Sequence, residues 1–352
     1  MQKTLSIIVP TYNMDALLRN DLQSLVVEED LLDKLEVLVV NDGSKDRSSE
    51  IAHEFEAAYP GTFKVIDKSN GNYGSCINTG LKVVSGKYVK IMDADDSLLS
   101  HNLGVLIKRL SEIDADLVLS DYIKYYGEND QVTVSYGIPS DKILRAVDYY
   151  EFPALKEIQL PAVTYRTEIF RTIHYHQTEG ISYTDMEWCF SPMSQVGKIY
   201  YMNLPVYRYL LNREGQTMDA GVQLRRFSNV LTSLTSMVNT YAAIDADDEV
   251  KNYLAGQLVR HMVYVYRFYL ILNKNIDRAG LRQLDILVKE KCPQAYMLSS
   301  MDEYRKKIPY RYIENWRTGK NEYIPLKILI KERILDFLGS IHLKMMGKTN
   351  GH

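Results

Sequence analysis

The chain has 352 residues, of which 46% are hydrophobic and 25% are charged, and its formal net charge is −3. This length is typical of about two domains, and the composition is that of a globular protein with a sizeable core. The weak net charge argues against a nucleic-acid-binding protein. The three cysteines are scattered, with no Cys-x-x-Cys pair, which argues against a disulfide framework or a zinc ribbon and fits a reducing compartment.

No segment predicts a signal peptide or a membrane span. The apolar run that follows Met1 is short and ends at Pro10. The best candidate span, Met262 to Leu272, is interrupted by Arg267 and predicts a buried helix. We therefore expect a cytoplasmic protein.

Short apolar runs alternate with helical periodicities over roughly the first 120 residues. Pro10 is expected to end the first strand, because proline cannot donate to a sheet ladder. The alternation, with short Gly, Asn and Asp turns, predicts βαβ units and a Rossmann-like α/β fold with a mostly parallel central sheet. The predicted strands are 5–9, 36–40, 63–66, 88–92 and 116–119, and the predicted helices are 14–27, 47–59, 74–84 and 101–113.

The pattern is weaker after about residue 125. Residues 131–136 and 198–209 predict strands, the second with a bend at Pro205, and residues 184–196 predict a helix. Apolar residues then recur at helical spacing over 221–298, which predicts a helical C-terminal region.

Asp93, Asp95 and Asp96 follow the fourth predicted strand directly. Three carboxylates this close repel one another unless a cation or strong donors lie among them. Mg²⁺ and Mn²⁺ prefer carboxylate oxygens and bridge to substrate phosphates, so a divalent metal is one interpretation. The alternative is an acidic turn that caps the next helix through Asp96 and Ser97, and the motif alone does not decide between them.

Two further polar clusters, 11–13 and 41–44, also follow predicted strands. Parallel sheets bind ligands beyond the carboxyl ends of their strands, where all three clusters should meet. Tyr12 is suited to stack on a base, and Asp42 to accept a hydrogen bond from a base or ribose. Surface packing of Tyr12 and an ordinary Asp42-Gly43 turn are the alternatives, and the convergence of three clusters favours a ligand site.

Three motifs together make the chain resemble the family 2 glycosyltransferases of the GT-A fold. They are Ser6-Ile-Ile-Val-Pro-Thr-Tyr-Asn13, Glu36-Val-Leu-Val-Val-Asn-Asp-Gly-Ser44, and the stretch from Asn70-Gly-Asn-Tyr-Gly74 through Asn78, Gly80 and Gly86 to Met92-Asp-Ala-Asp-Asp96. The match covers roughly the first 120 residues in the order and spacing of the family.

The resemblance implies a binding site for a nucleotide sugar, usually a uridine one. It implies that Asp95 binds a divalent metal, Mn²⁺ or Mg²⁺, on the donor diphosphate, and that Asp93 contacts the ribose or the metal environment. Lys90 is a weaker candidate for the donor pocket. Arg213 and Gln216 lie in a segment similar to the one that closes over the diphosphate, with a polar loop as the alternative. The implied nucleotide-sugar-binding residues are Pro10, Tyr12, Asn13, Asp42, Asn72, Asp93, Ala94, Arg213 and Gln216.

The resemblance also implies a catalytic base, because the family is inverting and activates its acceptor hydroxyl with a carboxylate in a Glu/Asp-Asp motif. Asp185 matches the second acidic position, whereas Thr184 stands where the first acid is usual. Glu187 is the fallback. The alternative for Asp185 is a helix N-terminal charge favoured by the dipole.

These matches imply a GT-A catalytic domain over 1–217, in which 1–125 bind the nucleotide sugar and 126–217 form the acceptor side. Residues 218–352 would be a helical C-terminal region with a basic amphipathic tail. From Arg305 to Lys348 there are eleven Lys and Arg residues against four Asp and Glu residues. The apolar residues of this tail share one helical face and are Leu326, Ile330, Ile334, Phe337, Leu338, Ile341 and Met345. Such a helix suits an anionic membrane surface, packing on the body, or packing on a second subunit of a homo-oligomer.

The leading hypothesis is an inverting transferase that moves a sugar from a UDP-sugar to a hydroxyl of a glycan or lipid-linked acceptor. The product would serve polysaccharide or cell-envelope synthesis. If the tail binds lipid, the enzyme would act at the inner face of the membrane. A degenerate member that binds nucleotide or scaffolds an assembly is the non-enzyme alternative. A nucleotidyltransferase ranks lower because no Gly-rich basic loop follows the first strand, and a dehydrogenase because no GxGxxG does. His174 and His176 have the spacing of a metal pair but are more typical of structural or exposed histidines.

Overall fold

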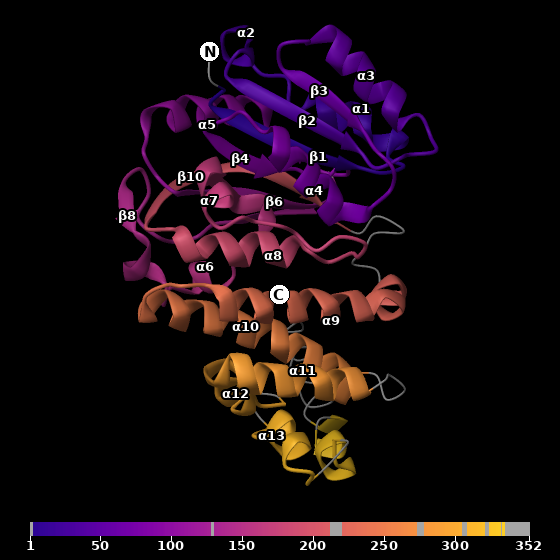
Figure 1. Cartoon of the computed structure of the whole chain (residues 1–352), viewed down its shortest axis with the longest axis vertical. Helices are drawn as coiled ribbons and strands as arrows, with labels where there is room; N and C mark the ends of the chain where they lie inside the picture. Colours follow the sequence, from indigo (N-terminus) through magenta and orange to yellow (C-terminus); the bar gives the residue numbers. More distant parts are fainter. Residues whose placement is uncertain are drawn as a thin grey trace, which may run out of the picture. The chain divides into compact units, whose positions relative to one another are not determined.

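The computed structural model describes residues 3–127, 130–211, 220–272, 278–304, 308–320, 324–331 and 333–334. The chain divides into two compact units, Met1–Leu254 and Ala255–His352. The first unit is α/β and includes α9 (Ala220–Ala243), the first helix of the expected C-terminal region, and the second unit is helical where it is described (Figure 1).

The described strands of the first unit form one sheet with the order β3-β2-β1-β4-β9-β6-β10-β5, and β7 and β8 pair with β6 and β10. The four strands from β3 to β4 are parallel, as are β6 and β10, while β9 runs antiparallel between β4 and β6. The predicted α/β fold with a mostly parallel sheet is therefore confirmed. The strands are β1 (Leu5–Thr11), β2 (Leu35–Asn41), β3 (Phe63–Asp67), β4 (Tyr88–Ile91), β5 (Ser97–Leu98), β6 (Leu117–Gly127), β7 (Asp130–Val134), β8 (Ile143–Arg145), β9 (Val163–Arg166) and β10 (Lys198–Leu210).

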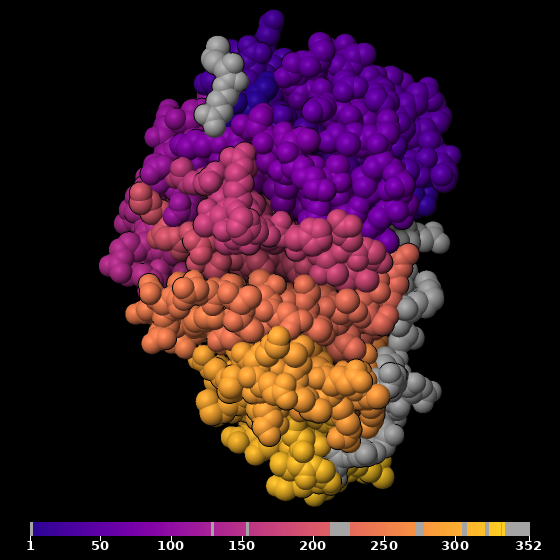
Figure 2. Space-filling view, in the orientation of Figure 1, coloured from indigo at the N-terminus to yellow at the C-terminus, as the bar shows by residue number. Residues whose placement is uncertain are grey.

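Helices cover the sheet, so β1 and β2 are almost wholly buried. In Figure 1, α3 lies above β2 and β3 while α4 lies below β1, and the indigo atoms of the first strands are mostly hidden on the face that Figure 2 shows. The α-helices of the first unit before α9 are α1 (Asp15–Gln23), α2 (Glu29–Leu32), α3 (Ser48–Ala58), α4 (Asn72–Val83), α5 (Ser100–Glu112), α6 (Pro153–Lys156), α7 (Thr167–Thr172) and α8 (Asp185–Phe190).

Pro10 does not end the first strand, so that prediction was wrong: β1 continues to Thr11, which pairs with Asn41. The Thr11 carbonyl accepts from the Asp42 N–H, so Pro10 faces the other side of the strand, toward β4. The pairing of β1 with β4 stops at Ile8. The missing N–H of Pro10 therefore removes no ladder bond.

The register brings the three polar clusters to one edge of the sheet, as predicted. Thr11 and Asn41 end their strands side by side. Ile91, the last residue of β4, pairs with Ile8, and the Met92 N–H donates to the Ile8 carbonyl at 3.0 Å. The loop that carries Asp93 therefore leaves the sheet next to the ends of β1 and β2.

The second unit begins within α10 (Asp248–Arg267), which continues into a π-helix (Phe268–Leu272). Between Met262 and Leu272, where a buried helix was predicted, the chain is helical and most residues whose burial is described are buried. It is followed by α11 (Arg278–Lys291), α12 (Pro293–Ser300) and α13 (Tyr312–Arg317). Among the described residues, no helix combines the length and apolarity that a membrane crossing requires.

Candidate active site

Asp42 holds the loop that leads into α4. One carboxylate oxygen accepts from Lys68 Nζ at 2.6 Å and from the Gly71 N–H at 2.9 Å, and the other accepts from the Asn72 N–H at 2.9 Å. Asp42 is buried, whereas Asn72 is exposed and adopts a φ of 66°. The structure thus gives Asp42 a role in shaping the loop that the sequence did not reveal, and its contact with a nucleoside stays a prediction.

The cluster after β1 is tied to the cluster after β2. The Asn13 N–H donates to Ser44 Oγ at 3.0 Å, and Asn13 Oδ1 accepts from the Lys45 N–H at 2.8 Å. These bonds fix Asn13 at a φ of 53°. Tyr12, next to it, is 45% exposed, so its ring is available to stack on a ligand.

Two tyrosines hold the loop that carries the aspartates. Tyr73 OH, from α4, donates to Asp93 Oδ1 at 2.7 Å. Tyr207 OH, from β10, accepts from the Asp93 N–H at 3.1 Å and donates to Asp96 Oδ2 at 2.6 Å. The sequence gives no sign of these partners of Tyr207, because they lie more than a hundred residues earlier in the chain.

Asp96 does not cap the following helix, so that interpretation was wrong. The residue is 2% exposed, and its second oxygen accepts from the Leu210 N–H at 2.7 Å. The N-cap position of α5 is Leu99, which makes no side-chain cap bond. Asp96 instead fastens the end of β10 to the aspartate loop.

The site concentrates negative charge. Burial, followed by the nearby Asp95 carboxylate, raises the pKa of Asp93 to about 7, and Asp185 adds to the rise. Burial and the carboxylates of Asp96, Asp93, Asp185 and Asp95, in that order, raise the pKa of Tyr209. The fold therefore brings Asp185 from α8 within electrostatic range of the loop after β4, although 89 residues separate Asp185 from Asp96 in the chain.

Two residues at the start of α8, Thr184 and Glu187, are buried and hydrogen-bonded inside the protein. Thr184 is buried, and its hydroxyl and carbonyl oxygens accept from Gln177 Nε2 at 2.9 and 3.0 Å. Glu187 is also buried. It accepts from the N–H and hydroxyl of Thr178 and, at 2.9 Å, from Ser233 Oγ of α9.

Asp185 differs from both, because solvent reaches it. Protein atoms around it still desolvate its carboxyl in part and raise its pKa, while N–H bonds from Asp185 and Met186 oppose the rise. Of the two acidic residues in this turn, Asp185 is exposed, whereas Glu187 is buried and hydrogen-bonded to Thr178 and Ser233. The burial of Glu187 favours Asp185 over this fallback, and the choice of base stays a prediction.

A hydrogen-bonded link joins α4 to α8. Asn78 Nδ2 donates to the Gln177 carbonyl at 2.9 Å, and the Gln177 N–H donates back to Asn78 Oδ1 at 2.9 Å. Gln177 then bonds to Thr184, the residue before Asp185. Gly74 allows this close approach, because a Cβ there would lie 2.1 Å from the Thr178 carbonyl oxygen.

Lys90 does not belong to the donor pocket, which corrects that interpretation. Its side chain is 0% exposed and donates to the carbonyl oxygens of Pro161 at 2.6 Å and Val163 at 3.1 Å. Burial lowers the pKa of Lys90 to about 7. The residue ties β4 to the start of β9, inside the fold.

This buried lysine predicts a pH dependence of stability. Because the pKa of Lys90 is lower in the folded than in the unfolded chain, the unfolded chain binds its proton more tightly between about pH 7 and pH 10, and stability rises with pH in that window. Relative to Lys90→Met, the wild type should gain about 2 kcal/mol of unfolding free energy between pH 7 and pH 9 in urea titrations. The exposed Lys82 offers a control, since Lys82→Met should leave the difference between the two pH values unchanged. An equal Lys90→Met effect at both pH values would contradict the assignment.

Of the other implied residues, Ala94 is 3% exposed and Pro10 is half-buried at the end of β1. Arg213 and Gln216 lie outside the described residues. No group of three or more His, Cys, Asp or Glu residues within the described ranges is arranged to hold a metal ion. His174 and His176 are both exposed and belong to no such group.

Comparisons with known proteins indicate the class of enzyme to which this α/β fold belongs, that of the glycosyltransferases. Residues 6–175 match the model of the family described as Glycosyl transferase family 2. Over these residues, just under half of its length, the chain is similar to the family 2 glycosyltransferases.

Relatives and solved structures extend the similarity beyond that domain. The chain is 28% identical over 257 residues to the uncharacterized glycosyltransferase MG060 homolog of Mycoplasma pneumoniae, which covers 68% of this chain and 79% of that protein. It is 23% identical to the uncharacterized glycosyltransferase MG025 of Mycoplasma genitalium, over 77% and 87% of the two chains. Residues 1–349 of TarS from S. aureus, solved in complex with UDP-GlcNAc, superpose with a TM-score of 0.68 at 19% identity, over 90% of this chain and 92% of that one. The last similarity shows the GT-A fold.

Proposed function

We propose that the chain is an inverting glycosyltransferase that moves a hexosyl or N-acetylhexosaminyl group from a UDP-sugar to a hydroxyl of a glycan or lipid-linked acceptor. The observation that carries the proposal is the solvent-reached carboxyl of Asp185, held within electrostatic range of Asp93. UDP is the nucleotide we propose because TarS, similar in fold, was solved with UDP-GlcNAc and with UDP.

Asp185 acts as the general base in this proposal. Its raised pKa makes the carboxylate a stronger acceptor for the proton that the attacking hydroxyl releases. The replacement of the usual first acid by Thr184 does not weaken the proposal, because that position is buried and bonded to Gln177. The non-enzyme alternative therefore gains no support from Thr184.

Asp95 is the proposed metal ligand, with Asp93 beside it. A divalent cation fits the donor set, because carboxylates whose charges raise the pKa of Asp93 would be stabilised by a positive charge between them. One or two carboxylates suffice for Mg²⁺ or Mn²⁺ when substrate phosphates complete the coordination. When bound, the metal would offset the negative charge that grows on the departing diphosphate.

A panel of nucleotide sugars tests the donor assignment. In the presence of Mn²⁺, UDP-sugars at about a hundredfold over Kd should add about 2.7 kcal/mol of stability, seen as a rise in melting temperature. Asp95→Asn should remove the Mn²⁺-dependent part of this rise. Stabilisation by GDP-sugars alone would overturn the choice of UDP, and no stabilisation by any nucleotide sugar would overturn the transferase proposal.

The C-terminal tail is the proposed membrane contact, which would favour a cell-envelope acceptor and a location at the inner membrane face. In the helix over 326–331 and just beyond it, Leu326, Ile330 and Ile334 are 71%, 50% and 53% exposed. The neighbouring Lys327 and Lys331 are exposed too. Exposed apolar side chains beside lysines suit an anionic lipid surface.

Vesicles containing phosphatidylglycerol test this contact. Because burying one large aliphatic side chain contributes about 1.5–3 kcal/mol, Leu326→Ser and Ile330→Ser should each weaken vesicle binding by about tenfold or more. Ile286→Ser is the matched control, since Ile286 is 57% exposed on α11. If the wild type ignores the vesicles but dimerises, and Leu326→Ser makes it monomeric, the tail is a subunit contact instead.

A further inference from the structure

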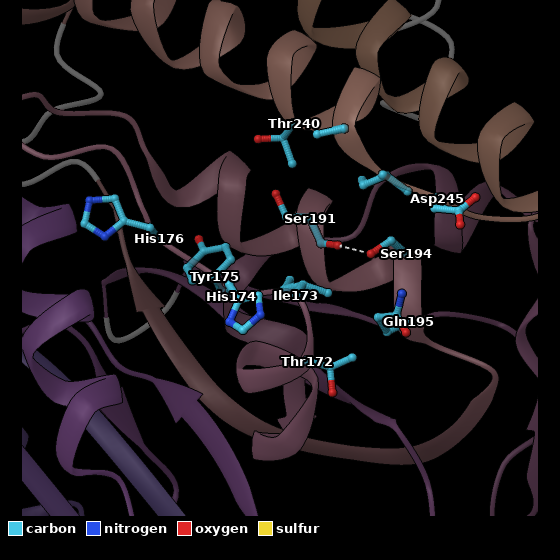
Figure 3. A pocket seen from close by; sticks show the side chains of 12 residues that line it. Thr172, Ile173, His174, Tyr175, His176, Ser191, Ser194, Gln195, Thr240 and Asp245 are labelled. Atoms are coloured by element: carbon cyan, nitrogen blue, oxygen red, sulfur yellow. Dashed lines mark hydrogen bonds between the residues drawn. The ribbon is translucent and has the colours of Figure 1, made fainter.

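A pocket of about 480 Å³ opens at the end of α8 opposite to Asp185 (Figure 3). This volume lies within the range of small-ligand sites. The walls come from the chain that follows α7, from the 3₁₀ helix Ser191–Gln195, and from the end of α9 with the turn after it. The lining residues are Thr172, Ile173, His174, Tyr175, His176, Ser191, Ser194, Gln195, Thr240, Ala243, Ile244 and Asp245.

The lining has the chemistry of a site for neutral, hydroxyl-rich ligands. Hydroxyls from two threonines and two serines, the Gln195 amide and two imidazoles offer both donors and acceptors. Ile173 and Ile244 add aliphatic surface, which suits the C–H faces of a sugar ring. The lining contains no Lys or Arg and one carboxylate, so it offers little to a phosphate or another anion.

The pocket is built on a rigid base. The Phe170 ring stacks on Trp188 at 4.2 Å between centroids, and Tyr175 meets Trp188 edge-on at 5.8 Å. Ser191 and Ser194 are buried, and Ser194 Oγ donates to the Ser191 carbonyl at 2.8 Å, the bond drawn in Figure 3. A preformed wall lowers the entropy cost of binding.

The wall also carries backbone strain. His174 adopts a φ of 48°, which an L-residue disfavours. Its N–H donates to the Arg171 carbonyl at 3.1 Å, and the Tyr175 N–H donates to the Phe170 carbonyl at 2.9 Å. Strained residues held by such bonds collect at functional sites.

One side chain connects the pocket with the proposed base. Tyr175 lines the pocket, and its hydroxyl donates to Gln177 Oε1 at 3.0 Å. Gln177 Nε2 in turn donates to Thr184 Oγ1, next to Asp185. At a helical rise of about 1.5 Å per residue, Ser191 lies about 9 Å along the chain direction from Asp185, a distance that a short oligosaccharide can bridge.

We propose that this pocket binds a neutral sugar residue of the acceptor glycan, one that lies beyond the residue that receives the new sugar. Its place in the reaction rests on the proposed function, whereas glycan binding by the pocket does not. Occupancy of the pocket would orient the acceptor chain, and Tyr175 and Gln177 would then be positioning residues that link the bound glycan to Asp185.

The test is binding of the full chain, labelled with a fluorophore, to a printed array of neutral oligosaccharides, with phosphorylated glycans on the same array. Thr240→Trp fills the pocket and should lower the signal on the bound neutral glycans at least tenfold. Thr232→Trp is the matched control, an exposed threonine on the same helix that does not line the pocket, and it should bind as the wild type does. Gln195→Ala, at an exposed lining residue, is a second variant that removes a polar contact without filling space, and it should weaken binding severalfold.

Circular dichroism and melting temperatures establish that each variant folds, and Gln195→Ala decides the result if Thr240→Trp does not fold. No neutral glycan bound by the wild type, equal loss in both tryptophan variants, or binding of phosphorylated glycans alone would each overturn the proposal. Nucleotide-sugar binding by the wild type is measured in parallel. Donor binding without glycan binding removes the pocket proposal alone, and glycan binding without donor binding removes the transferase proposal alone.

Discussion

Asp185→Asn is expected to lower kcat for sugar transfer by about 10²- to 10⁴-fold while leaving the fold and donor binding intact. Asparagine keeps the size of the side chain and an oxygen for the N–H groups of Asp185 and Met186. It cannot take the proton of the acceptor hydroxyl. The loss should therefore appear in turnover and not in the melting temperature or in Kd for the donor.

The dependence of wild-type kcat on pH gives a second test of Asp185 as the base. Because desolvation raises the pKa of Asp185, protonation should remove activity at a pH above the usual aspartate range near 4. The acid limb of kcat against pH is the measurement, with UDP release as the assay. A limb that persists unchanged in the residual activity of Asp185→Asn would assign it to another group.

Glu187→Gln is the informative comparison, since both variants exchange a carboxylate for an amide in one helical turn. Glu187 accepts from Thr178 and Ser233, so an amide nitrogen there would face a donor. We expect lower stability with turnover retained in the folded fraction. The reverse pattern, with full activity in Asp185→Asn and none in folded Glu187→Gln, would identify Glu187 as the base.

Local patterns in the sequence predict the first half of this fold well. The apolar runs that become β1, β2 and β4 are buried on both faces, as a parallel sheet requires of its central strands, whereas the edge strand β3 is partly exposed. Because the carboxyl ends of neighbouring parallel strands lie at one edge of the sheet, the convergence of Asn13, Asp42 and Asp93 at that edge could be predicted from the sequence. The family motif likewise selected Asp185, which the fold leaves open to solvent.

What the sequence did not predict depends on contacts distant along the chain. The short β9 inserts antiparallel between β4 and β6, and its four residues carry no periodicity that distinguishes them. Asp96 is of a residue type that commonly caps helices, yet its hydrogen-bond partners are Tyr207 and Leu210, more than a hundred residues later. Lys90 and Glu187 were candidates for the donor pocket and for the base, because the sequence does not reveal the distant elements that bury them.

Gly74→Ala is expected to be the most damaging single-methyl change near the site. A Cβ at Gly74 would lie 2.1 Å from the Thr178 carbonyl oxygen and 2.9 Å from its carbonyl carbon. Both atoms are backbone, so no side-chain rotation relieves the clash. The helix and the 177–178 segment must move apart, and we expect a loss of about 1–3 kcal/mol of unfolding free energy.

The same movement should also displace the proposed catalytic base, Asp185. Separation of Gly74 from Thr178 would stretch the paired bonds between Asn78 and Gln177, and Gln177 holds Thr184 beside Asp185. A shift of about 1 Å at a catalytic group can lower turnover by about 10²-fold. We therefore expect Gly74→Ala to reduce kcat in the folded fraction as well as stability, measured by urea unfolding and UDP release on one preparation.

Substitutions at two other helical glycines serve as controls, because they distinguish the steric effect of a new Cβ from the general effect of alanine on helix stability. Gly256, in α10, has nothing within 4 Å of its Cβ position, so Gly256→Ala should add about 0.5–1 kcal/mol of stability. At Gly80 the nearest atoms belong to the side chain of Ile8, at 2.8 Å, so Ile8→Ala should partly rescue Gly80→Ala. No side-chain truncation can rescue Gly74→Ala, because its obstacle is the main chain. If Gly74→Ala instead gains stability as Gly256→Ala does, α4 and the 177–178 segment are not in the close contact that holds Asp185 in place.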